Sequence, residues 1–149
     1  ALRFDVAMRG ALGIGSNLNR LDEEELAEYA EYIRFYKRMR HAIQHGKLYR
    51  LQRLEEYGTS AILYVTPDGR EAVYSLAIRD FLTGKHLPHA ALRGLNPRAV
   101  YSVQDWHGHE VYRLNGTELM TLGFPRDPRQ IAGYSRTYYL MQIEEENYV

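Results

Sequence analysis

The segment DWHGHE, at residues 105–110, carries the side chains with the clearest potential for chemistry in this sequence. His107 and His109 stand two positions apart, so they would share one face of an extended strand. Together with Asp105 or Glu110 they would supply the nitrogen and oxygen atoms that bind a metal ion. Gly108 between them is typical of a hairpin turn, and no further ligand is evident. We therefore favour a turn over a metal site.

Three glycines in the segment RGALGIGSNL raise the question of phosphate binding. Gly10, Gly13 and Gly15 follow the order G-x-x-G-x-G, whereas a dinucleotide fingerprint reads G-x-G-x-x-G. A phosphate-binding loop also needs Gly-Lys-Ser/Thr, and here Ser16 and Asn17 follow the last glycine. The glycines therefore favour close packing of the chain, or close approach of its backbone to a ligand.

The other chemistry-bearing residues form no complete catalytic set. His41 and His45 are four positions apart but lack the glutamate of the H-E-x-x-H zinc motif. Three acidic clusters are typical of a helix start, a turn and a solvated tail; they lie at 22–25, 55–56 and 144–146. Asp5 and Asp105 lie among apolar residues and are the carboxylates to watch. No serine stands in a G-x-S-x-G setting.

Composition excludes several classes of function. The 149 residues suffice for one domain with a core, and 19 Lys and Arg balance 19 Asp and Glu. This neutrality gives no electrostatic reason to expect nucleic acid or a membrane surface as partner. The absence of cysteine excludes disulfides and thiolate sites and fits the cytoplasm, where we expect the protein. No apolar run approaches the ~20 residues of a membrane helix, and a start at alanine indicates a cut or engineered end.

One long helix must position the N-terminal half of the chain. Asp22 is the expected N-cap, Glu25 completes a capping box, and Gly46 is the expected stop. The helix is therefore predicted at about residues 22–45. The face expected to meet neighbouring structure carries Tyr36, Met39 and Ile43.

Short strands with turn signals follow the helix. SAILYVT and EAVYSLAIR flank the turn PDG, and RAVYSVQD and HEVYRLNG form a second candidate hairpin. ELMTLGF and SRTYYLMQIEE complete the predicted strands. This pattern predicts an antiparallel β-sandwich or barrel at residues 46–149.

The segment before the helix predicts a fragment of a larger fold. ALGIG is apolar on successive residues, as in a strand buried on both faces of a parallel sheet. A strand followed by a long helix is one β/α unit, and nothing else in the chain supplies its neighbours. We therefore expect residues 1–45 to be the last β/α unit of a larger domain, followed by a C-terminal β domain at residues 46–149.

Four segments, in order, resemble the C-terminal part of the α-galactosidases of glycoside hydrolase family 36. FDVAMRGALGIGSNL resembles their last barrel strand, and residues 21–51 resemble the closing barrel helix. The most specific matches are Tyr36, Lys37, Arg40, Ile43, Gln44, Gly46, Leu48, Tyr49, Arg50 and Leu51. LRGLNPRAVYSV and NGTELMTLGF resemble two later family segments, with Phe124 in place of a leucine.

The resemblance implies a mainly β fold, an antiparallel β-sandwich preceded by one strand and one helix of a TIM barrel. It implies an enzyme that hydrolyses terminal α-linked galactose with retention, using two aspartates and no metal or other cofactor. Both aspartates lie on earlier barrel strands, so we carry over no catalytic, substrate-binding or metal-binding residue. The chain alone is expected to be structural and inactive, with the remainder of the barrel or a second chain as partner, in a homo-oligomer.

A carbohydrate-binding β-sandwich module is the alternative. Trp106 and the 13 tyrosines could stack on sugar rings. The tyrosines of VYSV, VYRL and TYYL alternate with apolar residues, which is more typical of a core. An exposed row of aromatic side chains on one sheet would favour the binding module.

Overall fold

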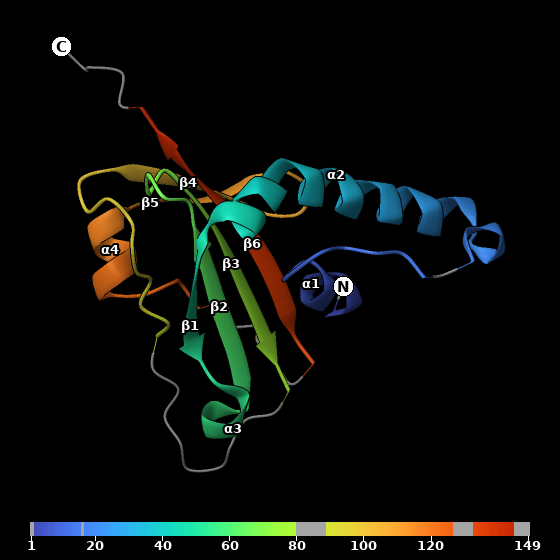
Figure 1. Cartoon of the computed structure of the whole chain (residues 1–149), viewed down its shortest axis with the longest axis horizontal. Helices are drawn as coiled ribbons and strands as arrows, with labels where there is room; N and C mark the ends of the chain where they lie inside the picture. Colours follow the sequence, from blue (N-terminus) through green and yellow to red (C-terminus); the bar gives the residue numbers. More distant parts are fainter. Residues whose placement is uncertain (1, 16, 80–88, 127–132, 145–149) are drawn as a thin grey trace.

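The computed structural model describes residues 2–15, 17–79, 89–126 and 133–144 (Figure 1). Its strands are β1 (Lys47–Gln52), β2 (Thr59–Val65), β3 (Glu71–Ile78), β4 (Val100–Gln104), β5 (Glu110–Asn115) and β6 (Ser135–Ile143). Its helices are α1 (Leu2–Ala7), α2 (Glu23–His45), α3 (Leu54–Tyr57) and α4 (Gly116–Thr121), with a 3-10 turn at Leu18–Arg20. None of the helices in these ranges is long and apolar enough to cross a membrane.

The strands form one antiparallel sheet in the order β1-β2-β3-β6-β4-β5. The two predicted hairpins, β2–β3 and β4–β5, are confirmed, and the C-terminal strand β6 joins them. The mainly antiparallel β domain is therefore confirmed. The described strands form a single sheet rather than the two sheets of a sandwich. Helices and loops, instead of a second sheet, cover its two faces.

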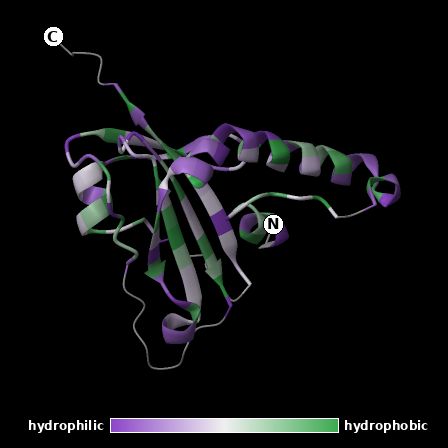
Figure 2. Ribbon diagram, in the orientation of Figure 1, coloured by the Kyte–Doolittle hydropathy of each residue, from purple (hydrophilic) through white to green (hydrophobic). Residues whose placement is uncertain are grey.

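One face of the sheet carries the larger hydrophobic core. Side chains alternate between faces along a strand, and Leu63, Tyr74 and Leu140 are buried on this face. The loop before β4 and the helix α4 add buried Leu92 and Leu119. Figure 2 shows the hydrophobic residues concentrated along β2 and β3.

The opposite face packs against α2. Met39 lies in one cluster with Val73 of β3 and Tyr139 of β6. The three residues predicted to face neighbouring structure are all buried in this cluster: Tyr36, Met39 and Ile43. This interpretation of the helix face is confirmed, and the neighbouring structure is the β domain.

The predicted ends of α2 are confirmed. Asp22 accepts a hydrogen bond from the Glu25 N–H at 2.8 Å, and Glu25 accepts one from the Asp22 N–H at 3.0 Å. Gly46 follows the last helical residue with an ordinary φ of −79°. Glycine is required there because a Cβ would lie 2.8 Å from the Val65 carbonyl oxygen of β2.

Only the C-terminal part of α2 lies on the sheet. Residues 23–28 are exposed, and the first fully buried residue of the helix is Tyr32. Figure 1 shows the N-terminal turns of α2 extending well beyond the sheet, with the segment that follows α1 running beneath them. We call residues 10–15 and 17–28 the projecting arm. Its exposed large apolar side chains are Ile14, Leu18 and Leu26.

The N-terminal strand prediction is wrong in this structure. Residues 2–7 form the helix α1, and residues 11–15 pair with none of the six described strands. A buried parallel strand needs partners on both edges, and the six described strands supply none for this segment. The backbone bonds locally instead, with the Met8 N–H donating to the Phe4 carbonyl at 2.8 Å. The assignment of residues 1–45 to a larger domain stays a prediction.

Two further elements differ from the predictions. ELMTLGF is not a strand: its first residues belong to α4, which begins with an Asn115–Glu118 capping box. That N-x-x-E signal outweighs the apolar content of the segment. The edge strand β1 was not among the predicted strands, although Lys47–Gln52 pairs with β2.

Among the described glycines, Gly116 has the closest backbone neighbour. A Cβ at this position would lie 2.0 Å from the Asn96 carbonyl oxygen and 3.1 Å from the Pro97 Cα. Because backbone atoms cannot rotate away, Gly116→Ala is expected to lower the free energy of unfolding by about 2–3 kcal/mol in urea denaturation. Gly13→Ala is the control, since a Cβ there meets nothing within 4 Å and should cost less than about 0.5 kcal/mol. Equal losses would contradict the close approach.

Candidate functional site

Asp5 is buried where α1 meets the sheet. Its side chain is 4% exposed. One carboxylate oxygen accepts a hydrogen bond from Ser135 Oγ at 2.5 Å, and the other accepts one from Thr137 Oγ1 at 2.8 Å. Both donors lie on β6. The carboxylate that the sequence analysis singled out is therefore fully engaged in holding α1 on the sheet.

Arg9, two residues after the end of α1, makes the second polar contact of the N-terminal segment with the sheet. Its Nε donates to Ser75 Oγ at 2.9 Å, and its two Nη atoms donate to Ser60 Oγ at 2.6 Å and to the Ser60 carbonyl at 3.0 Å. Burial lowers the pKa of Arg9, and the nearby Asp5 carboxylate acts in the opposite direction. We call the set of contacts made by Asp5 and Arg9 the α1 junction.

Two tyrosines hold the chain just after the α1 junction. The Tyr64 hydroxyl donates to the Arg9 carbonyl at 2.7 Å, and the Tyr36 hydroxyl donates to the Gly10 carbonyl at 2.8 Å. The Leu12 N–H in turn donates to the Tyr36 hydroxyl at 3.3 Å. The glycine segment therefore leaves the sheet from a fixed base.

The glycines themselves are not crowded by the described residues. Gly10, Gly13 and Gly15 are exposed, and a Cβ on any of them would meet nothing within 4 Å. The predicted role in close packing is therefore not found among the residues that the structure describes. A small hollow of about 110 Å³ lies between this segment, α1 and α2, and Phe4 and Tyr29 are among its lining residues.

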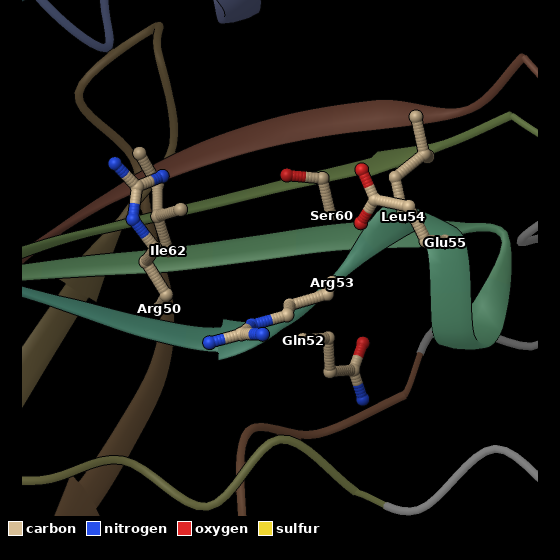
Figure 3. Close-up of a pocket in the computed structure, with 7 residues that line it drawn as sticks. All are labelled: Arg50, Gln52, Arg53, Leu54, Glu55, Ser60 and Ile62. Carbon is tan, nitrogen blue, oxygen red and sulfur yellow. The ribbon is translucent and has the colours of Figure 1, made fainter.

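A larger hollow of about 360 Å³ lies where β1 ends and α3 begins (Figure 3). Arg50, Arg53 and Glu55 line it together with Ser60 and Ile62 of β2. Figure 3 shows the Arg53 side chain extending along β1 toward Arg50, with the Ser60 hydroxyl facing the same space. We call this cavity the β1 hollow. Sequence analysis gave no sign of it.

The DWHGHE segment forms a turn, as favoured. Asp105 Oδ1 accepts hydrogen bonds from the N–H groups of His107 and His109 at 3.0 Å each, and Gly108 has a φ of +81°. His107 Nδ1 lies 2.9 Å from a carboxylate oxygen of Glu31 on α2. In the part of the chain that the structure describes, no three His, Asp or Glu side chains are grouped as metal ligands.

The remaining candidates also hold elements together. His41 Nε2 lies 2.6 Å from a carboxylate oxygen of Glu71 on β3 and so ties the end of α2 to the sheet. His45 is the last residue of α2. Of the acidic cluster at 144–146, only Glu144 is among the described residues, and it pairs with Arg70 at 3.1 Å. Acid–base catalysis needs carboxylates that face a shared cavity, and neither hollow is lined by more than one.

The aromatic side chains do not form a sugar-binding row. Tyr32 is buried between the rings of Phe4 and Trp106, and Tyr74 stacks on Phe124 inside the core. Every Phe, Tyr and Trp side chain among the described residues is buried or half-buried. The feature that would have favoured a carbohydrate-binding module is therefore not seen in these ranges.

Sequence reasoning missed most of the α1 junction. Arg9 was not singled out, and neither were its serine partners on β2 and β3 or the two hydroxyls that bind Asp5. One signal was available: hydroxyl residues at alternate positions, such as Ser135 and Thr137, occupy a single face of a strand. A polar stripe on an otherwise apolar face indicates a polar partner above it.

Comparison with known proteins covers nearly the whole chain. The family model "Glycosyl hydrolase family 36 C-terminal domain" matches residues 59–140. Alpha-galactosidase 1 of Pediococcus pentosaceus is 30% identical over 97% of this chain and 19% of its own length. Probable alpha-galactosidase C of Aspergillus flavus is 32% identical over 78% of this chain and 15% of its own length. The chain thus spans less than a fifth of the length of these relatives.

Solved structures agree with the sequence matches. The family 36 α-galactosidase AgaB from Geobacillus stearothermophilus superposes with a TM-score of 0.82 at 28% identity, over 95% of this chain and 19% of that one. The antiparallel β domain therefore has the fold of the corresponding part of an α-galactosidase. Because the family model matches more than half of the chain, the chain belongs to glycosyl hydrolase family 36, and residues 59–140 are its C-terminal domain.

Proposed function

We propose that this chain is the C-terminal part of an enzyme that hydrolyses terminal α-linked galactose from oligosaccharides, and that its role there is structural. The observation that carries the proposal is the similarity to α-galactosidases over 95–97% of the chain. The two carboxylates of a retaining glycosidase would come from the part of the enzyme that this chain does not include. The β domain would brace the catalytic domain.

The shape of the N-terminal third supports this role. The projecting arm leaves the sheet with exposed Ile14, Leu18 and Leu26, which are 37–46% exposed. Exposed apolar side chains that are grouped on one projecting segment are typical of a surface that another part of a protein covers. We propose that the remainder of the enzyme covers this surface. We also propose that the intact enzyme is a homo-oligomer and lies in the cytoplasm.

Hydrolysis of p-nitrophenyl α-galactoside tests the proposal. We expect turnover by the full-length parent protein and only the uncatalysed background from residues 1–149. The matching β-galactoside is the control for the sugar, and the parent should leave it intact. Activity of the isolated chain would overturn the structural role. Inactivity of the parent toward the α-galactoside would overturn the proposed substrate.

A further inference from the structure

The β1 hollow lies on the same face of the sheet as α1. Arg50 of β1 pairs with Ile62 of β2, and Ser60 stands two positions before Ile62, so the three side chains share this face. Ser60 also accepts the hydrogen bond from Arg9, so the β1 hollow and the α1 junction are adjacent. The hollow therefore opens beside the place where the chain first reaches the sheet.

The β1 hollow is cationic. Across the described ranges, neither Arg50 nor Arg53 makes a hydrogen bond or an ion pair with another side chain. Glu55 is the single acidic residue in the lining, and Arg9 adds positive charge behind Ser60. A guanidinium group can donate two parallel hydrogen bonds to a carboxylate. Two such groups beside the cavity match a carboxylate side chain in charge, and the volume of about 360 Å³ leaves ample room for one.

The length of the relatives indicates where a partner would come from. The relatives are more than five times as long as this chain, and the matched part is their C-terminal domain. The missing polypeptide would therefore precede residue 1 and reach the sheet through α1, beside the hollow. Leu48, which is 36% exposed on the same face, would give that polypeptide an apolar contact next to the arginines.

We infer that the β1 hollow binds an Asp or Glu side chain from the polypeptide that precedes residue 1 in the intact enzyme. This inference rests on the proposed function, because it takes the chain to be one part of a larger protein. Hydrogen bonds from Arg50 and Arg53 to this carboxylate would hold the β domain in one orientation on its neighbour. Bidentate pairs of arginine and carboxylate provide geometric specificity as well as binding energy.

Photocrosslinking in the full-length parent tests the inference. Arg50 is replaced by p-benzoylphenylalanine, and the crosslinked peptide is identified by mass spectrometry. We expect an intramolecular crosslink to a segment that precedes residue 1, close to an Asp or Glu. The same probe at Arg98, an exposed residue of the loop before β4, is the control and should not reach that segment. Crosslinks to a second copy of the chain, or none at all from position 50, would overturn the inference.

A charge reversal gives an independent measurement. In the full-length parent, Arg50→Glu is combined with Arg53→Glu, so that the carboxylate of the preceding polypeptide would face two glutamates instead of two arginines. We expect this repulsion to speed thermolysin cleavage between the preceding polypeptide and the β domain by about tenfold. Arg98→Glu is the matched reversal and should leave the cleavage rate unchanged. Equal rates for all three proteins would overturn the inference. The proposed function is tested separately, by hydrolysis of the α-galactoside by the unaltered parent. A failure of the proposed function is therefore distinguishable from a failure of this inference.

Discussion

Replacing Tyr32 with alanine is expected to lower the free energy of unfolding by about 3–5 kcal/mol, measured by urea denaturation. Tyr32 is 2% exposed and lies between two rings. Its ring centroid is 4.3 Å from that of Phe4 and 4.2 Å from that of Trp106, with interplanar angles of 4° and 5°. The alanine variant loses both stacks and leaves a cavity where three elements meet.

The stack explains why the effect is large. Phe4 belongs to α1, Tyr32 to α2, and Trp106 to the turn between β4 and β5. Each stacked aromatic pair adds about 0.5–1.5 kcal/mol beyond the area that it buries. Burial, followed by the nearby Asp5 carboxylate, raises the pKa of the Tyr32 hydroxyl, so the side chain stays neutral throughout the measurement.

Tyr32→Phe is the matched control, because it keeps the ring and removes only the hydroxyl. We expect this variant to lose less than about 1 kcal/mol. A phenylalanine variant as unstable as the alanine variant would show that the hydroxyl, and not the stack, holds these elements. A double-mutant cycle with Phe4→Ala should give a coupling of about 0.5–1.5 kcal/mol.

The elements that sequence reasoning found are those set by neighbouring residues. Asp22 and Glu25 cap α2 within a span of four residues, and the PDG turn sets the β2–β3 hairpin. Asn115 and Glu118 form a capping box of the same kind at the start of α4. The apolar residues of ELMTLGF led instead to the prediction of a strand there. Local signals therefore decide these elements, and errors arise where two local signals compete.

The contacts that sequence reasoning missed join residues far apart in the chain. Asp5 and its partners are separated by 130 and 132 positions, and Arg9 lies 51 positions from Ser60. No spacing rule connects residues at such distances. The strand prediction for residues 11–15 is wrong for another reason. A parallel strand is defined by neighbouring strands, and the described part of the chain offers none to this segment.

Replacing Asp5 with alanine is expected to lower the free energy of unfolding by about 3 kcal/mol, because a hydrogen bond to a buried charged group contributes about 1.5–3 kcal/mol. The variant leaves the Ser135 and Thr137 hydroxyls, which are 2% and 4% exposed, without their acceptor. It also removes the carboxylate that offsets the desolvation of Arg9. Hydrogen exchange should rise most in α1, which loses its contact with β6.

Asp5→Asn and a double-mutant cycle separate the carboxylate from the volume that it fills. Asparagine keeps one acceptor oxygen and the same shape, so its loss should be about half that of alanine. Asp5→Ala combined with Thr137→Val should cost less than the sum of the two single changes, since the valine no longer presents an unsatisfied hydroxyl. Strict additivity would mean that Asp5 does not accept the hydrogen bond from Thr137. In that case α1 would be held by Arg9 and by the Tyr32 stack, and only disruption of those contacts would release the N-terminal segment from the β domain.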